Sequence, residues 1–262
     1  ELSEADFWSL SENARDAGVI FLSTPFDEES VDLLDQIGVP AFKIPSGEIT
    51  NFPLLKKIAQ KFKPIILSTG MATLGEVEEA LNYLRGFGAE EIVLLHCTTS
   101  YPAPTMSVNL RAMETLRNAF QAPVGYSDHT EGITVPIAAA AMGACIIEKH
   151  FTLDKKLPGP DHMASLEPRE LVAMVKAVRD VELACGNGIK GPTEEERAIK
   201  KVVRRSIVAK KEINAGDLLE EDSLAIKRPA TGIEPRYFES VVHKRAKTKI
   251  LKDQVIRWDM IE

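Results

Sequence analysis

The stretches VGYSDHT (124–130) and CIIEKHF (145–151) decide the fold and the candidate site of this chain. Each begins with a short apolar segment typical of a buried strand and carries a histidine at its end, and the residues between them are typical of one helix. A strand, a helix and a second strand predict a parallel pair, because the crossover returns the chain to the same end of the sheet. His129 and His150 would then lie at one edge of the sheet, close enough to bind one divalent cation.

Strand-like segments alternate with helical ones along the first 150 residues. Their polar ends are 22 to 29 residues apart, close to the repeat of about 30 residues in a (β/α)₈ barrel. We therefore expect an α/β fold built on a parallel sheet of the barrel kind. The six predicted strands are VIFLST (19–24), AFKIPS (41–46), PIILSTG (64–70), IVLLHCT (92–98), VGYSDH (124–129) and CIIEKH (145–150).

Capping-box patterns mark two helix starts, at Thr73 with Glu76 and at Ser3 with Asp6. The second of these helices precedes the first predicted strand. Helical spacing predicts which side chains face the core. They are Leu74, Val77, Ala80 and Leu81 in the helix after Thr73, and Phe7, Leu10 and Ala14 in the helix after Ser3.

Near residue 189 the sequence changes to a charged, linker-like composition, which predicts two domains. We expect a barrel-type domain at 1–188, a charged, helix-like linker at 189–205 and a small domain at 206–262, where short apolar segments and turns favour short strands. Basic residues of the linker are most simply a solvated helix face. They are Lys200, Lys201, Arg204 and Arg205.

The bulk composition excludes several classes of protein. A formal charge of -7 argues against nucleic acid as a partner. The longest apolar stretch, 135–147, is shorter than the roughly 20 residues of a membrane helix, so no membrane span is expected. Three scattered cysteines indicate reduced thiols and a cytoplasmic protein. A chain that starts with Glu1 and has no signal peptide suggests a fragment or a processed protein.

The polar strand ends predict the chemistry, because they gather at the active-site face of a parallel barrel. Two imidazoles without a nearby thiolate favour Mn²⁺ or Mg²⁺ over a closed zinc site, and an open coordination position would polarise a carbonyl. Lys43, on a strand, needs an anion if it faces the interior. Hydroxyl groups at the strand ends suit a phosphate or carboxylate, or simply cap the strands. These residues are Thr24, Ser46, Ser68, Thr69 and Ser127.

Three further residues have both a functional and an ordinary interpretation. Glu48 follows a turn and would serve as an acid, a base or a hydroxyl acceptor, or only as a helix N-terminal acid. Asp161, in the proline-rich segment 158–166, and Tyr101 would contact a polyhydroxylated substrate, or anchor their loops.

Seven motifs in order along the chain resemble the sialic acid synthase family. They are FLSTPF, FKIPSGEITN, ILSTGMAT, LLHCTTSYPAP, VGYSDHT, EKHFTLDKKLPGPDH and IKRPATGI. The resemblance implies a (β/α)₈ TIM barrel joined to a small antifreeze-like (SAF, β-clip) domain in a domain-swapped homodimer. It also implies a transferase that condenses phosphoenolpyruvate with an N-acylated amino sugar.

The same resemblance assigns roles to residues. It implies that His129 and His150 bind the metal, and that Lys43, Thr24, Ser46, Thr99 and Ser127 surround phosphoenolpyruvate. Glu48, Tyr101 and Asp161 would meet the open-chain sugar. Arg228 would reach from the small domain into the partner subunit's pocket and contact the N-acyl group.

The chain also departs from the family pattern. Relatives carry two strands before the first one predicted here, with an acidic residue on the first and a lysine on the second, so the barrel should lack its first two strands. A six-unit sheet would have two unpaired edges, and the chain alone should be unstable or depend on another polypeptide. Thr99 stands where some relatives have Asn, and Met163 where many have Lys.

Four functions follow from these observations. The first is the synthesis of N-acetylneuraminate from phosphoenolpyruvate and N-acetylmannosamine. A legionaminate or related nonulosonate synthase would use the same barrel chemistry on another sugar. A binding module based on the antifreeze-like domain is a third, although the charged segment 212–229 does not suit an ice-binding face. An inactive fragment is the fourth.

Overall fold

The computed structural model describes residues 2–262 and divides into two units, Glu1–Asn187 and Gly188–Glu262. The first unit contains a curled parallel sheet in the order β1-β2-β3-β4-β5, which forms half of a barrel. Its strands are β1 (Phe42–Ile44), β2 (Ile65–Ser68), β3 (Ile92–Cys97), β4 (Val124–Asp128) and β5 (Ile147–Lys149). The predicted α/β fold with a parallel sheet of the barrel kind is therefore confirmed.

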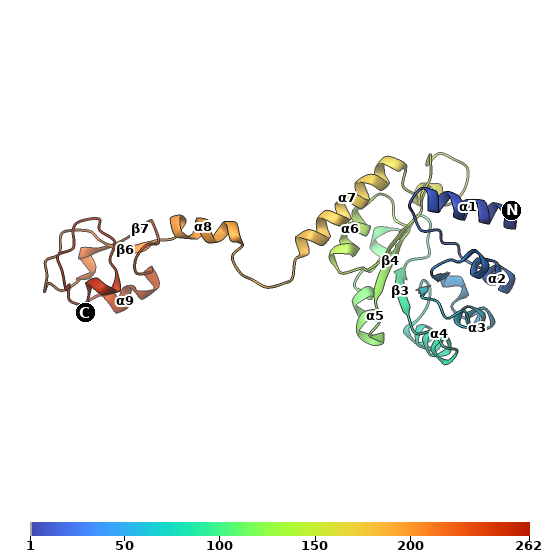
Figure 1. The fold of residues 1–262 in the computed structure, drawn as a ribbon, viewed down its shortest axis with the longest axis horizontal. Coiled ribbons are helices and arrows are strands. Elements are labelled where there is room, and N and C mark those ends of the chain that lie inside the picture. The colour runs from blue at the N-terminus through green and yellow to red at the C-terminus, as the bar shows by residue number, and fades with distance from the viewer. Residues whose placement is uncertain (1) are drawn as a thin grey trace. The chain divides into compact units, whose positions relative to one another are not determined.

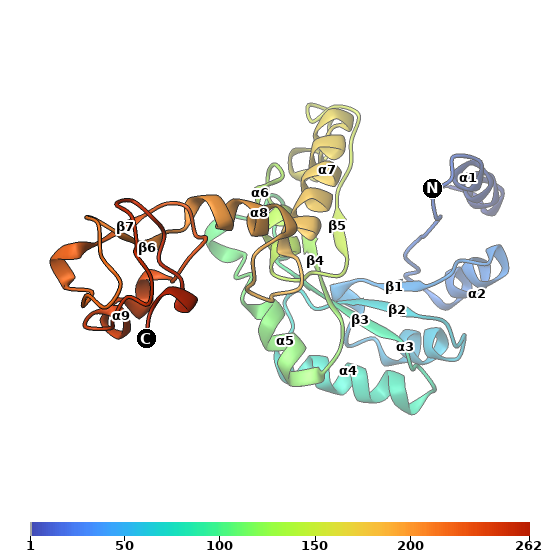
Figure 2. The same ribbon diagram turned by 60° about the vertical axis from the view of Figure 1, so that its left-hand side comes forward.

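Helices cover the convex side of this sheet and follow one another around it (Figure 1). Figure 2 shows α3, α4 and α5 on the same side of the strands. The helices of the first unit are α1 (Glu4–Asp16), α2 (Glu28–Ile37), α3 (Phe52–Ala59), α4 (Leu74–Gly86), α5 (Ala112–Phe120), α6 (Thr134–Ala141) and α7 (Pro168–Cys185). None of the helices described in residues 2–262 is both long and apolar enough to cross a membrane.

Successive side chains along each strand point alternately to the core beneath the helices and to the hollow of the half-barrel. On β1, Phe42 and Ile44 are fully buried in the core cluster beneath the helices, and Lys43 points the other way. On β4, Val124 and Tyr126 belong to the same core cluster, which leaves Ser127 on the inner side. The strand ends therefore present polar side chains to the hollow while apolar ones hold the helices.

The segment VIFLST (19–24), predicted as the first strand, is not a strand in the structure. Within residues 2–262, β1 pairs only with β2, so its outer edge is free and no ladder of backbone hydrogen bonds joins this segment to it. Its residues Val19 and Ile20 are 61% and 75% exposed. The apolar composition is typical of a strand, but a strand is defined by backbone pairing, which this segment does not make.

Helix α1 begins at the predicted capping box, in which the Ser3 hydroxyl accepts from the Asp6 amide and the Asp6 carboxylate accepts from the Ser3 amide. Two of the three residues predicted to face inward, Phe7 and Ala14, are half-buried. No residue of α1 is buried, and Leu10 is 44% exposed. Helix α1 contacts little beyond α2 in the described part of the chain, so none of its apolar side chains is fully buried.

Helix α4 starts at the predicted box of Thr73 and Glu76. Its buried stripe consists of Val77, Ala80, Leu81 and Leu84. Leu74 was expected in this stripe but is 47% exposed, because it is the first helical residue and lies beyond the end of the core.

We predict that Leu84→Ala lowers the free energy of unfolding by about 2–5 kcal/mol, because it leaves a cavity at a fully buried position. Leu74→Ala, on the same helix, is the matched control and should change stability by about 0.5 kcal/mol or less. Urea unfolding followed by circular dichroism measures both. Equal losses in the two variants would contradict the placement of the core.

The second unit contains short elements, as its turn-rich sequence predicts. Helix α8 (Glu194–Val203) has no buried residue, and its basic residues are exposed as expected. Strands β6 (Ser206–Ala209) and β7 (Leu224–Lys227) pair antiparallel, and α9 (Phe238–Val241) is a single turn. A separate core cluster that includes Ile207, Leu219 and Ile256 holds this unit together.

Candidate active site

The two histidines come together at the carboxyl ends of β4 and β5, as the parallel pairing predicts. Their ring centroids lie 5.2 Å apart. Two imidazoles that share an ion at bonds of about 2.1 Å have centroids no more than about 6.5 Å apart. The observed separation therefore allows one cation between them.

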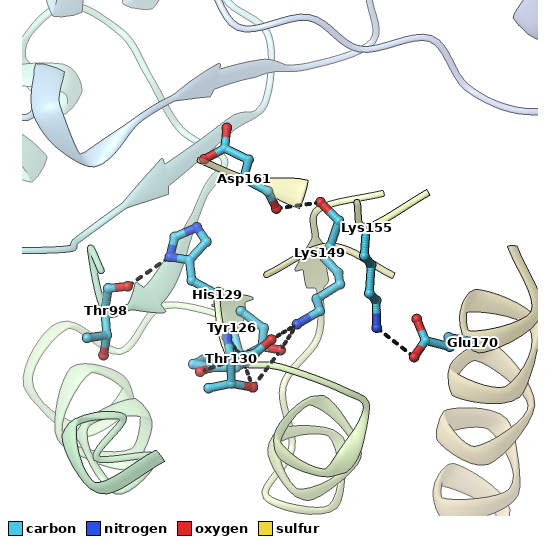
Figure 3. A network of polar contacts seen from close by, with 10 residues as sticks. Thr98, Tyr126, His129, Thr130, Lys149, Lys155, Asp161 and Glu170 are labelled. Atoms are coloured by element: carbon cyan, nitrogen blue, oxygen red, sulfur yellow. Dashed lines mark hydrogen bonds and ion pairs between the residues drawn. The ribbon is translucent and has the colours of Figure 1, made fainter. Parts of the chain in front are cut away.

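The protonation of His129 also suits a metal ligand. Its Nδ1 donates to the Thr98 carbonyl at 2.8 Å (Figure 3), so the lone pair of the neutral ring is on Nε2. Burial lowers the pKa of His129, and the neighbouring His150 lowers it further. The neutral ring is the form that binds metals.

Tyr101 packs against both imidazoles. Its ring centroid is 4.2 Å from that of His129 and 5.7 Å from that of His150, with an edge-on approach to the latter. Burial raises the pKa of the Tyr101 hydroxyl, and the nearby charges of Asp161 and Glu148 also raise it. The hydroxyl therefore stays protonated and can donate to a ligand at the mouth of the site.

An ion pair crosses the hollow from one edge of the sheet to the other. Lys43 Nζ on β1 lies 2.8 and 3.0 Å from the carboxylate oxygens of Glu148 on β5. The Ser127 hydroxyl donates to the same carboxylate at 2.6 Å. Lys43 thus faces the interior, and Glu148 is the anion that an ammonium needs there.

Glu148 is charged in this arrangement. Its burial alone would raise its pKa, but the ammonium of Lys43 and the hydrogen bonds from Lys43 and Ser127 outweigh burial and lower the pKa overall. Glu148 is not among the site residues predicted from the sequence. Its position two residues before His150 was the available signal, because alternate strand residues face the same side.

Beside this ion pair, the side chains of Ser46, Cys97 and Thr99 form a tight cradle around Gly70. Ser68 is 3% exposed, and its hydroxyl is the one buried side-chain polar atom in residues 2–262 without a hydrogen-bond partner. Next to it, a Cβ on Gly70 would overlap Thr99 Oγ1 and Cys97 Sγ and lie 3.1 Å from Ser46 Oγ. A free hydroxyl beside polar side chains that close tightly around Gly70 fits the oxygen atoms of a small ligand.

The other residues predicted for the site make the following contacts. Ser46 and Thr99 approach each other, with 3.4 Å between their hydroxyl oxygens. Thr24 is half-buried in the segment after α1, and among the described residues its side chain makes no hydrogen bond with the cluster. Glu48 accepts from Asn51 Nδ2 at 2.6 Å, and Asn51 caps α3, so its ordinary role at a helix start stays open.

Asp161 lies in an exposed loop that is anchored on both sides. Thr152 Oγ1 is 2.7 Å from His162 Nδ1, and Ser165 donates to the Asp161 carbonyl. Lys155 ties the loop to Glu170 of α7 at 2.7 Å (Figure 3). The Asp161 carboxylate itself is left for other contacts. Arg228 belongs to the second unit, where its Nε donates to the Val203 carbonyl at 2.8 Å.

The described residues 2–262 contain no group of three or more His, Cys, Asp and Glu side chains arranged to hold a metal ion. The candidate ligands are thus two imidazoles, which leave several positions around a cation to water or substrate. This fits the open site that a Lewis-acid role needs.

The model of the NeuB family matches residues 1–190, and that of the SAF domain matches residues 204–262. The chain belongs to the NeuB family. An N,N'-diacetyllegionaminic acid synthase of Campylobacter jejuni is 55% identical over 94% of this chain and 74% of its own length. The enzyme of the same name from Legionella pneumophila is 47% identical over 100% of this chain and 75% of its own.

Among solved structures, the N-acetylneuraminic acid synthetase of Leptospira borgpetersenii, in complex with citrate, matches with a TM-score of 0.72. It is 37% identical and covers 76% of this chain and 70% of its own. This NeuB protein is thus a condensing enzyme of the transferase type, a nonulosonate synthase. The recognised resemblance and the enzyme class are confirmed.

Proposed function

We propose that the protein condenses phosphoenolpyruvate with an N-acylated amino sugar to give a nonulosonate and phosphate. The observation that carries the proposal is the meeting of His129 and His150 with Lys43 and the free Ser68 hydroxyl on the inner side of one half-barrel. Family synthases use phosphoenolpyruvate and an amino sugar. The site offers separate places for an anion and for a carbonyl.

The chain's own residues would hold the two reactants. Lys43 and the hydroxyl groups of Ser68 and Ser127 would bind the phosphate and carboxylate of phosphoenolpyruvate, and we also propose Thr24, Ser46 and Thr99 for its surroundings. Tyr101 and Asp161 would bind sugar hydroxyl groups at the mouth. This orientation brings C3 of phosphoenolpyruvate to the aldehyde carbon of the open-chain sugar.

Phosphate loss requires water at C2 of phosphoenolpyruvate after the new bond forms, and the phosphate then leaves by C–O cleavage. The charged Glu148 lies in the hollow, where it can accept a hydrogen bond from that water. We propose Glu48 for a sugar hydroxyl or the same water. Lys43 would balance the charge of the phosphate throughout.

We further propose that His129 and His150 hold a divalent cation, Mn²⁺ or Mg²⁺. The water or substrate oxygens that would complete the coordination suit such an ion. When bound, the ion would polarise the aldehyde oxygen of the sugar. The facing rings and the free Nε2 of His129 support this assignment.

The precursor of N,N'-diacetyllegionaminate is the sugar that we favour. The two synthases with that name are 55% and 47% identical to this chain, whereas the N-acetylneuraminic acid synthetase is 37% identical. N-Acetylmannosamine, which would give N-acetylneuraminate, is the second candidate, since the same barrel chemistry serves both.

Product mass distinguishes these sugars directly. The enzyme is incubated with phosphoenolpyruvate, Mn²⁺ and either the diacetamido sugar or N-acetylmannosamine, and the product is weighed by mass spectrometry. We expect a nonulosonate product and metal-dependent phosphate release with at least one sugar, and a higher kcat/KM for the diacetamido sugar. Phosphate release with neither sugar would contradict the proposed function.

We also propose a domain-swapped homodimer in which Arg228 contacts the N-acyl group in the partner's site. Arg228→Ala should then raise the KM for the sugar about tenfold, the loss of one charge-assisted hydrogen bond, and leave the KM for phosphoenolpyruvate within about twofold. Arg236→Ala, another exposed arginine of the same unit, is the control. Equal changes in both KM values for Arg228→Ala would contradict this assignment.

A further inference from the structure

Strands β4 and β5 carry polar residues on two opposite faces. Ser127 and Glu148 are register partners and face the hollow. The next pair in register, Asp128 and Lys149, faces the other way, toward the core that contains Tyr126. Their side chains are 0% and 2% exposed, so a complete ion pair is buried directly behind the candidate site.

This buried pair holds the backbone on the far side of His129. Lys149 Nζ donates to Asp128 Oδ2 at 2.6 Å and also to the Thr130 carbonyl (Figure 3). Asp128 Oδ1 accepts from the Tyr126 hydroxyl at 3.0 Å, from the Thr130 amide at 3.1 Å and from the Thr130 hydroxyl at 2.9 Å. Both backbone polar groups of Thr130 are thereby fixed.

The Asp128–Lys149 ion pair holds the backbone next to both histidines. His129 lies between Asp128 and Thr130, which the ion pair ties together, and its ring is held from the opposite side by the Thr98 carbonyl. Lys149 immediately precedes His150. One ion pair therefore links the residue before the first imidazole to the residue before the second.

Stability alone does not account for this arrangement. Replacing a buried ion pair by apolar residues of similar volume is often neutral or stabilising, because the desolvation of two charges costs several kcal/mol. In some proteins a buried polar group instead fixes the register of neighbouring elements. Here the geometry that it fixes is the relative position of two strand ends.

We propose that Asp128 and Lys149 are positioning residues that set the separation and orientation of His129 and His150. This inference rests on the proposed function of the two histidines as a metal-binding pair. Neither residue faces the hollow, so neither contacts substrate. They act through the backbone of residues 128–130 and 149–150, much as outer-shell groups orient metal ligands elsewhere.

The test uses the double variant Asp128→Asn with Lys149→Met, which removes both charges and keeps the side-chain volumes similar. Tyr126→Phe is a milder second variant, because it deletes one hydrogen bond to Asp128 and keeps the ring in the core. Lys61→Met is the matched control: it removes a lysine paired with Asp32 and Asp35 at 2.7 and 3.0 Å on the helical side of the same unit.

Two measurements are made on each whole protein. The first is the imidazole ¹H–¹⁵N spectrum without metal, in which the chain's five histidines give separate signals. The second is the Kd for Mn²⁺, from the electron paramagnetic resonance signal of the free ion. Chemical unfolding of each variant shows whether the fold is retained.

For the double variant, we expect the His129 signals to lose the pattern of a single Nδ1–H tautomer and the Kd for Mn²⁺ to rise about tenfold or more. Tyr126→Phe should shift the same signals with a rise of about twofold, and Lys61→Met should match the native protein. Native-like His129 signals and Mn²⁺ affinity in both test variants would overturn the inference.

A failure of the proposed metal-binding role would be seen in the Mn²⁺ affinity of the native protein and of His150→Ala. In that case the native protein and His150→Ala would bind Mn²⁺ equally. The metal-free imidazole spectra would still decide whether the ion pair orients His129.

Discussion

His150→Ala is expected to lower kcat/KM by about a thousandfold or more and to abolish the response of turnover to added Mn²⁺. The reason is the size of the metal's contribution: polarisation of a carbonyl by a cation is worth several kcal/mol, and each 1.4 kcal/mol or so is a factor of ten in rate. His129→Ala should have the same effect, because a cation held by two imidazoles loses half of its protein ligands in either variant. Steady-state phosphate release over a range of Mn²⁺ concentrations measures both.

A histidine outside the site provides the control. His243 lies in the second unit, 3.5 Å from Glu220, and its backbone is in the left-handed region with φ 66°. Asparagine tolerates that conformation better than alanine, so His243→Asn is the appropriate variant. It should retain native turnover. Native turnover in His129→Ala or His150→Ala would refute the metal assignment.

The second large effect is expected at Gly70. Gly70→Ala places a methyl group where Thr99 Oγ1 and Cys97 Sγ already lie, within 3.1 Å of Ser46 Oγ. Both overlapping side chains are short, so Thr99 and Cys97 must shift and change the shape of the cradle. The energy of such overpacking is about 1–3 kcal/mol, and we expect it to raise the KM for phosphoenolpyruvate by about fivefold to 150-fold.

Gly47→Ala is the matched control for this substitution. Gly47 is next to Ser46, yet a Cβ there would meet nothing within 4 Å, and its φ is not in the left-handed region. We expect the KM values of Gly47→Ala to stay within about twofold of native. If Gly70→Ala leaves the KM for phosphoenolpyruvate equally unchanged, the cradle is not the phosphoenolpyruvate site.

The sequence predicted the parts of the fold that depend on local pattern and register. Apolar segments of β-branched residues located β1 to β5, and capping boxes located the starts of α1 and α4. The meeting of His129 and His150 followed from parallel pairing alone. Register also places Asp128 beside Lys149, although their role becomes visible only with the hydrogen bonds around Thr130.

Contacts that depend on how far the sheet curls could not be predicted. Lys43 and Glu148 are 105 residues apart and lie on the two edge strands, so their ion pair requires that the edges approach across the hollow. The position of Tyr101 against both imidazoles depends on the path of a loop. The prediction of a strand at 19–24 was wrong because composition does not show whether an apolar segment pairs with its neighbour.

The most direct test of this account is the location of Mn²⁺ in crystals of the protein soaked with the ion, from anomalous diffraction. We expect one strong peak within about 2–2.4 Å of His129 Nε2 and of a ring nitrogen of His150, close to the bond lengths of nitrogen-ligated metals. A peak at other residues, or none between these two rings, would contradict the central claim that they share a cation.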